Sequence, residues 1–336
     1  MAPESVRIIV EDQSQTGEAR RIARRLAQHS GFDEIRAEQI AIVVTEACTN
    51  LLKHGGGGEI LLSRGSDSCE IELLGLDRGP GMANLEKCLR DGFSTGSSPG
   101  QGLGAIQRLS TTSDFYSDVA RGTALVARWS VTAENASTPN PSARLHISGV
   151  SVCKPGQDVC GDSWGSEQNH SESTVLVADG LGHGPEAQTA SQEAVRMLHA
   201  NATLPPGALV ERAHQALRSS RGAAVAVARI DRAKGIVTFA GVGNIAGQVY
   251  SGAQPGPHLV SVNGTAGHQT QRIREFSYPW PDNGMLLMYS DGISTHAGLE
   301  AHPGLALRDP GLIAGVLYRD FSRRNDDATV VVAKSA

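Results

Sequence analysis

The chain has 336 residues, of which 40% are hydrophobic and 19% charged, and its formal net charge is −5. Two domains are the default expectation at this length, and the lack of a long basic run argues against nucleic-acid binding. No apolar stretch approaches the roughly 18 residues of a membrane span and the N-terminus has no secretory pattern, so we expect a cytoplasmic protein that does not bind membranes.

The first elements that the sequence predicts are a strand at residues 6–10, a helix at 18–28 and a longer helix at 34–53. At 100° per residue, Glu46 and Asn50 are stacked neighbours on one face of the longer helix. Another face is apolar and is predicted to be buried; its members are Ile40, Val44, Ala47 and Leu51. The longer helix therefore places a carboxylate and an amide side by side, away from the core.

A glycine-rich segment follows the strands predicted at 59–63 and 69–76. Asp77 ends the second strand, and Gly79 and Gly81 after it allow a ligand to approach the backbone closely. The exocyclic amine of adenine would suit such a carboxylate.

A second glycine-rich segment ends in Gly102 and Gly104, just before a helix predicted at 105–109. Glycines at the start of a helix expose backbone N–H groups to a phosphate, and the helix macrodipole favours an anion there. Either segment alone is weak evidence for a nucleotide site, but their order after the helix of Glu46 strengthens it.

Residues 131–143 (VTAENASTPNPSA) hold two prolines, two asparagines and no residue as large as leucine. Such a stretch cannot bury enough apolar surface to offset the entropy of ordering. We predict a linker here, between a first domain at 1–130 and a second at 144–336.

In the second half, acidic residues flank predicted strands at four places. They are Asp162 after a strand at 145–152, Asp179 at the end of a strand at 174–179, Asp291 after a strand at 285–290, and Asp326 before a strand at 330–333. Gly180 follows Asp179 and can offer its backbone carbonyl. Carboxylates and a carbonyl without His or Cys favour Mg²⁺ or Mn²⁺ over zinc.

The segments EACTNLLKHG, DRGPGM and GQGLGA resemble the N box and the two glycine boxes of the GHKL ATPase/kinase superfamily, in the same order. The stretch LEKCLRDGFSTGSSPGQGLGAIQRLS is similar to the lid of the RsbT-type switch kinases, which are serine/threonine kinases of bacterial stress signalling. This resemblance spans nearly all of residues 1–130 and implies an α/β sandwich that binds ATP.

The GHKL resemblance also implies residue roles. Phosphoryl transfer depends mainly on positioning and charge neutralisation, and these roles would supply both. Asn50 would ligate Mg²⁺, Glu46 would polarise the attacking hydroxyl as the catalytic residue, Asp77 would read adenine, Gly79 and Gly81 would admit the base, and Gly102 and Gly104 would contact phosphates.

The segments GDS, ADGLGHG, SDG and DDAT resemble the PPM-type metal-dependent Ser/Thr phosphatases, most closely their SpoIIE/RsbX-like branch. The match covers about 145–335 and implies a β-sandwich flanked by helices, so the fold class of the whole chain is expected to be α+β. Two divalent ions would replace a protein nucleophile in such an enzyme.

By this second resemblance, Asp179 bridges both ions, Asp327 supports the site without binding metal, and His183 shapes its loop rather than acting as an acid. The other expected ligands are Gly180 through its carbonyl, Asp162 and Asp291 on one ion, and Asp326 on the other. Gly161 stands where many eukaryotic members have an acidic residue.

Together the resemblances imply a bifunctional switch, a protein serine/threonine kinase joined to the phosphatase that reverses such phosphorylation. Its expected substrates are STAS-domain proteins of anti-sigma-antagonist or stressosome circuits, and its expected cofactors are ATP, Mg²⁺ and Mn²⁺. Two alternatives stay open for the first half. It could be an anti-sigma factor that sequesters a sigma factor, or a nucleotide-dependent docking switch that activates a downstream phosphatase without being a kinase.

Overall fold

The computed structural model describes residues 5–65, 70–89, 102–131 and 144–335. The described residues before the predicted linker form one compact unit, and those after it form another. All but the first residue of the predicted linker at 131–143 lies outside the described part of the chain.

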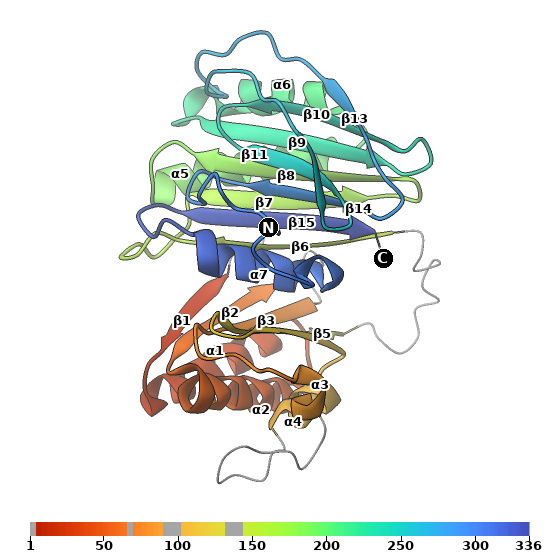
Figure 1. Ribbon diagram of the computed structural model, residues 1–336. Coiled ribbons are helices and arrows are strands. Elements are labelled where there is room, and N and C mark those ends of the chain that lie inside the picture. Colours follow the sequence, from red (N-terminus) through yellow and green to blue (C-terminus); the bar gives the residue numbers. More distant parts are fainter. Residues whose placement is uncertain (1–4, 66–69, 90–101, 132–143, 336) are drawn as a thin grey trace. The chain divides into compact units, whose positions relative to one another are not determined.

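The first unit is a five-stranded antiparallel sheet with helices packed on one face (Figure 1). In spatial order its strands are β1 (Val6–Val10), β2 (Gly58–Arg64), β3 (Glu70–Leu76), β5 (Gly122–Ser130) and β4 (Thr112–Asp118). The helices are α1 (Gln13–His29), α2 (Glu34–Asn50), α3 (Leu85–Leu89) and α4 (Gly102–Leu109). This arrangement confirms the α/β sandwich expected of the first half.

Helix α2 carries the residues that sequence reasoning singled out. Asp33 caps its N-terminus, where the side chain accepts a hydrogen bond from Arg36 N at 2.7 Å. The predicted apolar stripe is fully packed: Ile40, Val44, Ala47 and Leu51 are each at most 2% exposed. After Asn50 the helix widens into a π-turn, η1 (Leu51–Gly55), which ends at the left-handed Gly56.

The second unit is a sandwich of two five-stranded antiparallel sheets (Figure 1). One sheet has the order β13 (Phe276–Pro279), β10 (Ile236–Val242), β9 (Ala223–Asp231), β8 (Glu172–Gly180) and β7 (Asp162–Gln168). The other has the order β12 (Gln254–His258), β11 (Ala246–Ser251), β14 (Gly284–Tyr289), β15 (Ala328–Ser335) and β6 (Leu145–Val152). The β-sandwich prediction is thereby confirmed.

Helices cover the sandwich on both sides. Helices α5 (Pro185–Ala200) and α6 (Pro206–Ala216), the latter continued by the short η3 (Leu217–Ser219), pack on the sheet that contains β8. Helix α7 (Pro310–Phe321) packs on β15 and β6, after the short η4 (Leu305–Leu307). Valine, isoleucine and leucine side chains of both sheets form the core between them.

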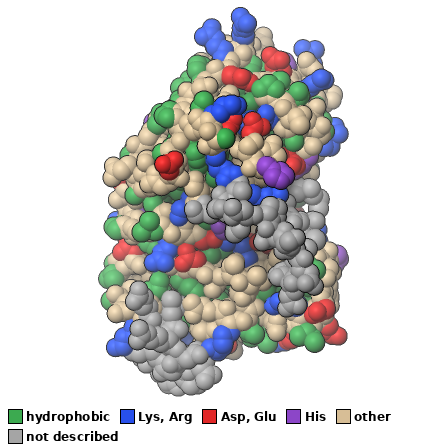
Figure 2. Space-filling view, turned by 90° about the vertical axis from the view of Figure 1, so that its right-hand side faces the viewer, with side chains coloured by type: hydrophobic (Ala, Val, Ile, Leu, Met, Phe, Trp, Pro, Cys, Tyr) green, Lys and Arg blue, Asp and Glu red, His purple; other side chains and the backbone are tan. Residues whose placement is uncertain are grey.

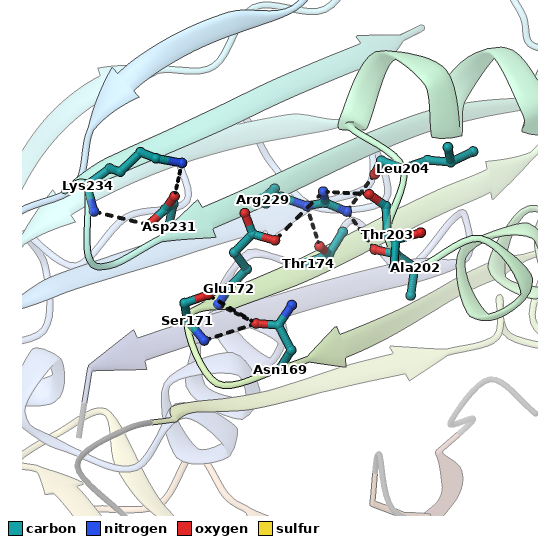
Figure 3. Close-up of polar contacts among 10 residues, drawn as sticks. All are labelled: Asn169, Ser171, Glu172, Thr174, Ala202, Thr203, Leu204, Arg229, Asp231 and Lys234. Carbon is teal, nitrogen blue, oxygen red and sulfur yellow. Dashed lines mark hydrogen bonds and ion pairs between the residues drawn. The ribbon is translucent and has the colours of Figure 1, made fainter.

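A half-buried arginine ties the loop after helix α5 to the sheet (Figure 3). Arg229 Nε on β9 donates a hydrogen bond to Thr174 Oγ1 on β8 at 3.0 Å. Its Nη2 donates to the carbonyl of Ala202, just beyond α5, at 2.6 Å. The guanidinium thus satisfies carbonyl groups of the loop between α5 and α6 and fixes this loop against β8, the strand that holds Asp179.

The surface carries both signs of charge. In the face shown in Figure 2, Lys and Arg side chains are interspersed with Asp and Glu rather than gathered in one basic stripe. Among the described residues, no helix is long and apolar enough to cross a membrane.

Candidate functional site

The predicted metal ligands Asp162, Asp179, Asp291 and Asp326 are called the acidic site below. Its centre is a pair of aspartates on neighbouring strands. Asp162 begins β7 and Asp179 lies near the end of β8, and the antiparallel register places these two residues directly opposite each other. Like charges in directly opposed positions destabilise a sheet. The apolar, fully buried run at 175–178 of β8 and the seven-pair ladder between β7 and β8 fix the register that holds the two carboxylates together.

The second sheet adds further carboxylates at the same end of the sandwich. Asp291 follows β14 and accepts a hydrogen bond from Asn244 Nδ2 at 2.8 Å. Ser290 Oγ donates to Asp162 Oδ2 at 2.6 Å and accepts from Thr329 N at 3.0 Å. Ser290 therefore joins the two sheets at the acidic site.

Asp327 supports the acidic site through backbone contacts. Its Oδ1 accepts from Lys154 N at 2.7 Å and its Oδ2 from Gly161 N at 2.9 Å. A Cβ on Gly161 would lie 2.7 Å from Asp327 Oδ2 and 3.0 Å from the Cβ of Ala187. The acidic side chain found here in many eukaryotic phosphatases would not fit beside this carboxylate.

Burial and mutual repulsion raise the pKa values of the opposed pair. The pKa of Asp179 rises to about 9, first because of burial and then because of the charges of four aspartates: Asp162, Asp291, Asp326 and Asp327. Burial likewise raises the pKa of Asp162 to about 7, although the bond from Ser290 opposes the shift. The crowding of these carboxylates therefore disfavours their ionised forms, which a bound cation would stabilise.

The donor set has the chemistry of a hard-cation site. Within the described part of the chain, no three acidic, histidine or cysteine side chains are arranged tightly enough to hold an ion as they stand. The carboxylates are nonetheless near enough for each to raise the pKa of Asp179, which is the charge pattern that Mg²⁺ or Mn²⁺ would relieve. Metal ligation by Asp162, Asp179, Gly180, Asp291 and Asp326 stays a prediction.

Gly180 is required as a glycine by helix α5. A Cβ there would lie 2.1 Å from the carbonyl oxygen of Ala187. This close packing, rather than a ligand, excludes a side chain at position 180. His183, in the same loop, is exposed.

In the first unit, the start of α4 lies against the polar face of α2. A Cβ on Gly102 would be 2.9 Å from Glu46 Oε2 and 3.5 Å from Asn50 Oδ1. The helix begins at Gly102 rather than at 105 as predicted, so Gly102 and the buried Gly104 are both helical. Within the described residues, the buried Nδ2 of Asn50 has no hydrogen-bond partner. An unsatisfied buried amide fits a polar ligand bound between the two helices.

The turn after β3 is built around Asp77. Its Oδ1 accepts from Gly79 N at 2.8 Å and from Thr123 N at 3.0 Å. A Cβ on Gly79 would lie 2.8 Å from the carbonyl oxygen of His54. Gly81 has φ +70°, and a Cβ there would lie 2.2 Å from a backbone oxygen. Protein packing therefore already requires both glycines, and their contact with a base stays a prediction.

Part of the proposed nucleotide site lies in residues 90–101, the centre of the predicted lid, which are outside the described part of the chain. Sequence reasoning missed Ser290 and Asn244 as contacts of the aspartates. A usable signal existed, because Ser290 directly precedes Asp291 at a strand end and Asn244 ends the glycine-rich segment AGVGN at 240–244.

Comparison with known families identifies the family that each unit matches. Residues 9–129 match the histidine kinase-like ATPase domain, and residues 170–335 match the stage II sporulation protein E (SpoIIE) domain. The chain is a histidine kinase-like ATPase domain fused to a SpoIIE-type phosphatase domain. Both predicted resemblances, and their order, are confirmed.

Two proteins of Bacillus subtilis (strain 168) are similar to the separate domains. The serine/threonine-protein kinase RsbT is 29% identical over 114 residues, which cover 33% of this chain and 86% of RsbT. The phosphoserine phosphatase RsbX is 23% identical over 183 residues, which cover 54% of this chain and 90% of RsbX. The chain thus combines an RsbT-like part with an RsbX-like part.

Solved structures resemble the phosphatase domain. One, from a study of the bacterial stressosome as a modular system for secondary-messenger signalling, has a TM-score of 0.53 and 26% identity, and covers 57% of this chain and all of its own. RsbX in complex with magnesium has a TM-score of 0.50 and 21% identity, and covers 57% of this chain and 96% of its own. These likenesses support the phosphatase fold of the second domain.

Proposed function

We propose that the chain both phosphorylates and dephosphorylates serine or threonine residues of STAS-domain proteins in a bacterial partner-switching pathway. The observation that carries the phosphatase half of this proposal is the direct opposition of Asp162 and Asp179 at the end of the sandwich, with a pKa of about 9 for Asp179. Carboxylates so close to one another favour the binding of divalent cations between them. The kinase half rests on the contact of Gly102 with Glu46 and Asn50.

The proposed hydrolysis depends on metal ions held by the acidic site. Asp162, Asp179, Asp291 and Asp326, with the Gly180 carbonyl, would hold them. Bound Mg²⁺ or Mn²⁺ would neutralise the phosphate oxygens and activate a water for attack. Asp327 and Ser290 would keep the ligands in place, since each bridges segments far apart in the sequence.

The proposed kinase reaction depends on α2. Glu46 would orient and polarise the substrate hydroxyl, and Asn50 would bind Mg²⁺ on the nucleotide. Two observations support this assignment: both side chains face Gly102 of α4, and the Asn50 amide has an unsatisfied buried donor within the described residues. Side-chain amide O and N atoms are interchangeable by rotation, so the same amide can turn its oxygen to a cation.

STAS-domain proteins are proposed as substrates because the ATPase domain is similar to the kinase RsbT and the phosphatase domain is similar to the phosphatase RsbX and to a stressosome structure. Running both activities on one residue would only consume ATP. We therefore propose that the two activities are regulated in opposite directions or act on different residues. Equal full rates on one purified substrate without an effector would contradict this.

The test measures the intact mass of a STAS-domain protein encoded near this gene. With ATP and Mg²⁺, the Asp179→Asn variant should add one phosphate that stays on. Wild type with Mn²⁺ should remove that phosphate after ATP is depleted. Glu46→Gln should bind ATP but add no phosphate, and Asp282→Asn, in an exposed turn between β13 and β14, should behave as wild type.

The outcomes separate the alternatives. ATP binding without phosphate transfer by Asp179→Asn would contradict the kinase half and favour a docking switch. Capture of a purified sigma factor by the same variant would favour an anti-sigma factor. A phosphorylated substrate that wild type leaves intact would contradict the phosphatase half.

A further inference from the structure

We infer that Arg221 of the phosphatase domain binds the phosphate group of the phosphoprotein, and that Glu186 competes with the phosphate for this arginine. The inference rests on the proposed phosphatase function and adds a substrate-binding residue to it.

Arg221 lies beside the loop that follows Asp179. Strand β9 pairs with β8 so that Ala224 is opposite Asp179 and Ala223 opposite Gly180. The contact continues past the strands, because Leu181 N donates to the Gly222 carbonyl at 3.0 Å. Arg221 therefore lies one residue beyond Gly222, at the end of the β8–β9 pairing that holds Asp179.

The guanidinium of Arg221 lies against the backbone of that loop. A Cβ on Gly182 would be 3.2 Å from Arg221 Nη1, and Gly182 has φ +90°, a conformation that favours glycine. The lack of a side chain at Gly182 thus leaves room for the guanidinium three residues after Asp179. The Arg221 side chain is 49% exposed, so it can meet a ligand from solvent.

The backbone of Arg221 is firmly held, whereas its side chain is not buried. The Arg221 carbonyl lies 2.8 Å from His268 Nε2. Gly222 has φ +79°, and a Cβ there would lie 2.6 Å from the carbonyl oxygen of Ala266. A fixed backbone with an exposed side chain is the arrangement that positions a binding group at low entropic cost.

One carboxylate already contacts the guanidinium. Arg221 Nε pairs with Glu186 Oε2 in the first turn of α5, and the Glu186 side chain is 69% exposed. Exposed ion pairs contribute little to stability, because water screens their charges. Arginine has five N–H donors in a planar fork that matches phosphate, so a phosphate dianion can displace or share this contact.

Charge explains why such a residue is needed. The ionised carboxylates of the acidic site repel a phosphate dianion wherever cations do not neutralise them. A cation that approaches from the loop side would attract the phosphate without competing for the metal ligands. Arg221 has this position and remains charged at any working pH.

The experiment measures hydrolysis of p-nitrophenyl phosphate with Mn²⁺, and its competitive inhibition by inorganic phosphate. Arg221→Ala should raise both KM and the inhibition constant of phosphate about tenfold, as expected for loss of a charge-assisted hydrogen bond at a half-exposed site. The Mn²⁺ concentration for half-maximal activity should not change. Arg218→Ala removes an exposed arginine three residues earlier and should match wild type.

Glu186→Gln distinguishes substrate binding from a structural ion pair. If Glu186 competes for the guanidinium, this variant should lower the inhibition constant of phosphate about twofold. Unchanged phosphate inhibition in Arg221→Ala, or weaker inhibition in both variants, would overturn the inference while wild type remains active. A wild-type chain that hydrolyses nothing would contradict the proposed function itself, and this inference with it.

Discussion

The two candidate sites of this chain are held in place in different ways. In the phosphatase domain, strand register sets the central pair, because Asp162 and Asp179 are opposite each other on β7 and β8. In the ATPase domain, the approach of one helix to another sets the site, because Gly102 of α4 lies against Glu46 and Asn50 of α2. Register is fixed along a whole ladder, whereas a helix contact can shift by small movements.

The two candidate sites also differ in their electrostatics. The phosphatase domain holds buried carboxylates together and raises the pKa of Asp162 and Asp179. The ATPase domain instead has a buried amide donor on Asn50 with no partner in the described residues. The first site crowds several carboxylates together, whereas the second places one carboxylate, that of Glu46, beside the amide of Asn50. Changes at the first should therefore have the larger effects.

Removing the carboxylate of Asp179 tests the acidic site most directly. Asp179→Asn should lower phosphatase kcat/KM by more than the roughly 10- to 100-fold that loss of an outer partner of a metal ligand costs. ATP binding by the other domain should stay unchanged. Hydrolysis assays with Mn²⁺ and calorimetric titration with ATP measure the two effects, and near-normal hydrolysis would refute the central role of this aspartate.

A backbone clash tests how rigid the acidic site is. A Cβ on Gly292 would lie 1.9 Å from the carbonyl oxygen of Asp327, so Gly292→Ala should destabilise the phosphatase domain by about 3 kcal/mol. Gly17→Ala is the contrasting change, because its Cβ on α1 would meet only the end of Arg21 at 3.7 Å. Denaturant unfolding should show loss in the first variant and slight gain in the second. Equal stability of the two would mean that the acidic end adapts easily.

The raised pKa values predict how pH changes the stability of the metal-free phosphatase domain. Between about pH 4 and 9 the folded state keeps protons on Asp179 that the unfolded state releases, and Asp162 does the same up to about pH 7. The free energy of unfolding should therefore fall as pH rises through this window.

Urea unfolding at several pH values with a chelator measures this slope. In a Trp129→Phe background, the fluorescence comes only from Trp164 and Trp280 of the phosphatase domain. Asp179→Asn should flatten the slope, and so should saturating Mn²⁺. A slope that neither change affects would assign the pH dependence to other groups.

The smallest effect is expected at the helix contact. In Gly102→Ala, the new Cβ would lie 2.9 Å from Glu46 Oε2, the far end of a flexible side chain that can move away. Alanine also favours a helix, so the fold should keep its stability within about 1 kcal/mol. ATP affinity should fall about tenfold or less, as measured by calorimetry against Gly17→Ala. A complete loss of folding would show that this contact is as rigid as the acidic site.

Sequence reasoning succeeded where periodicity was strong. The strand at 6–10 has the predicted bounds, and the buried stripe of α2 is the predicted one. It did not predict β4 and β5, whose mixed polar and apolar residues follow the nucleotide motifs, or the short exposed β12. Strands β4 and β12 lie at sheet edges and show no clear alternation, so pattern alone cannot find them. Strand β5 lies inside its sheet and is buried on both faces, which removes the alternation that marks a half-buried strand.

For the sites, the sequence named the aspartates but not what positions them. The motif order placed Asp179 and Asp291 at strand ends, which the structure shows. The roles of Ser290 and Arg221 depend on contacts between segments that only folding brings together. Likewise, Gly180 was expected as a ligand, and its need to admit α5 could not be read from spacing.

The contacts that complete the acidic site close very long loops. The bond from Ser290 to Asp162 spans 128 positions, and that from Gly161 to Asp327 spans 166. Loop closure costs entropy that grows with length, so these contacts are expected to form after the local hairpin of β7 and β8. A chain that has not yet paired β15 would have two opposed aspartates but no frame around them. Cation affinity would then report when the domain has finished folding.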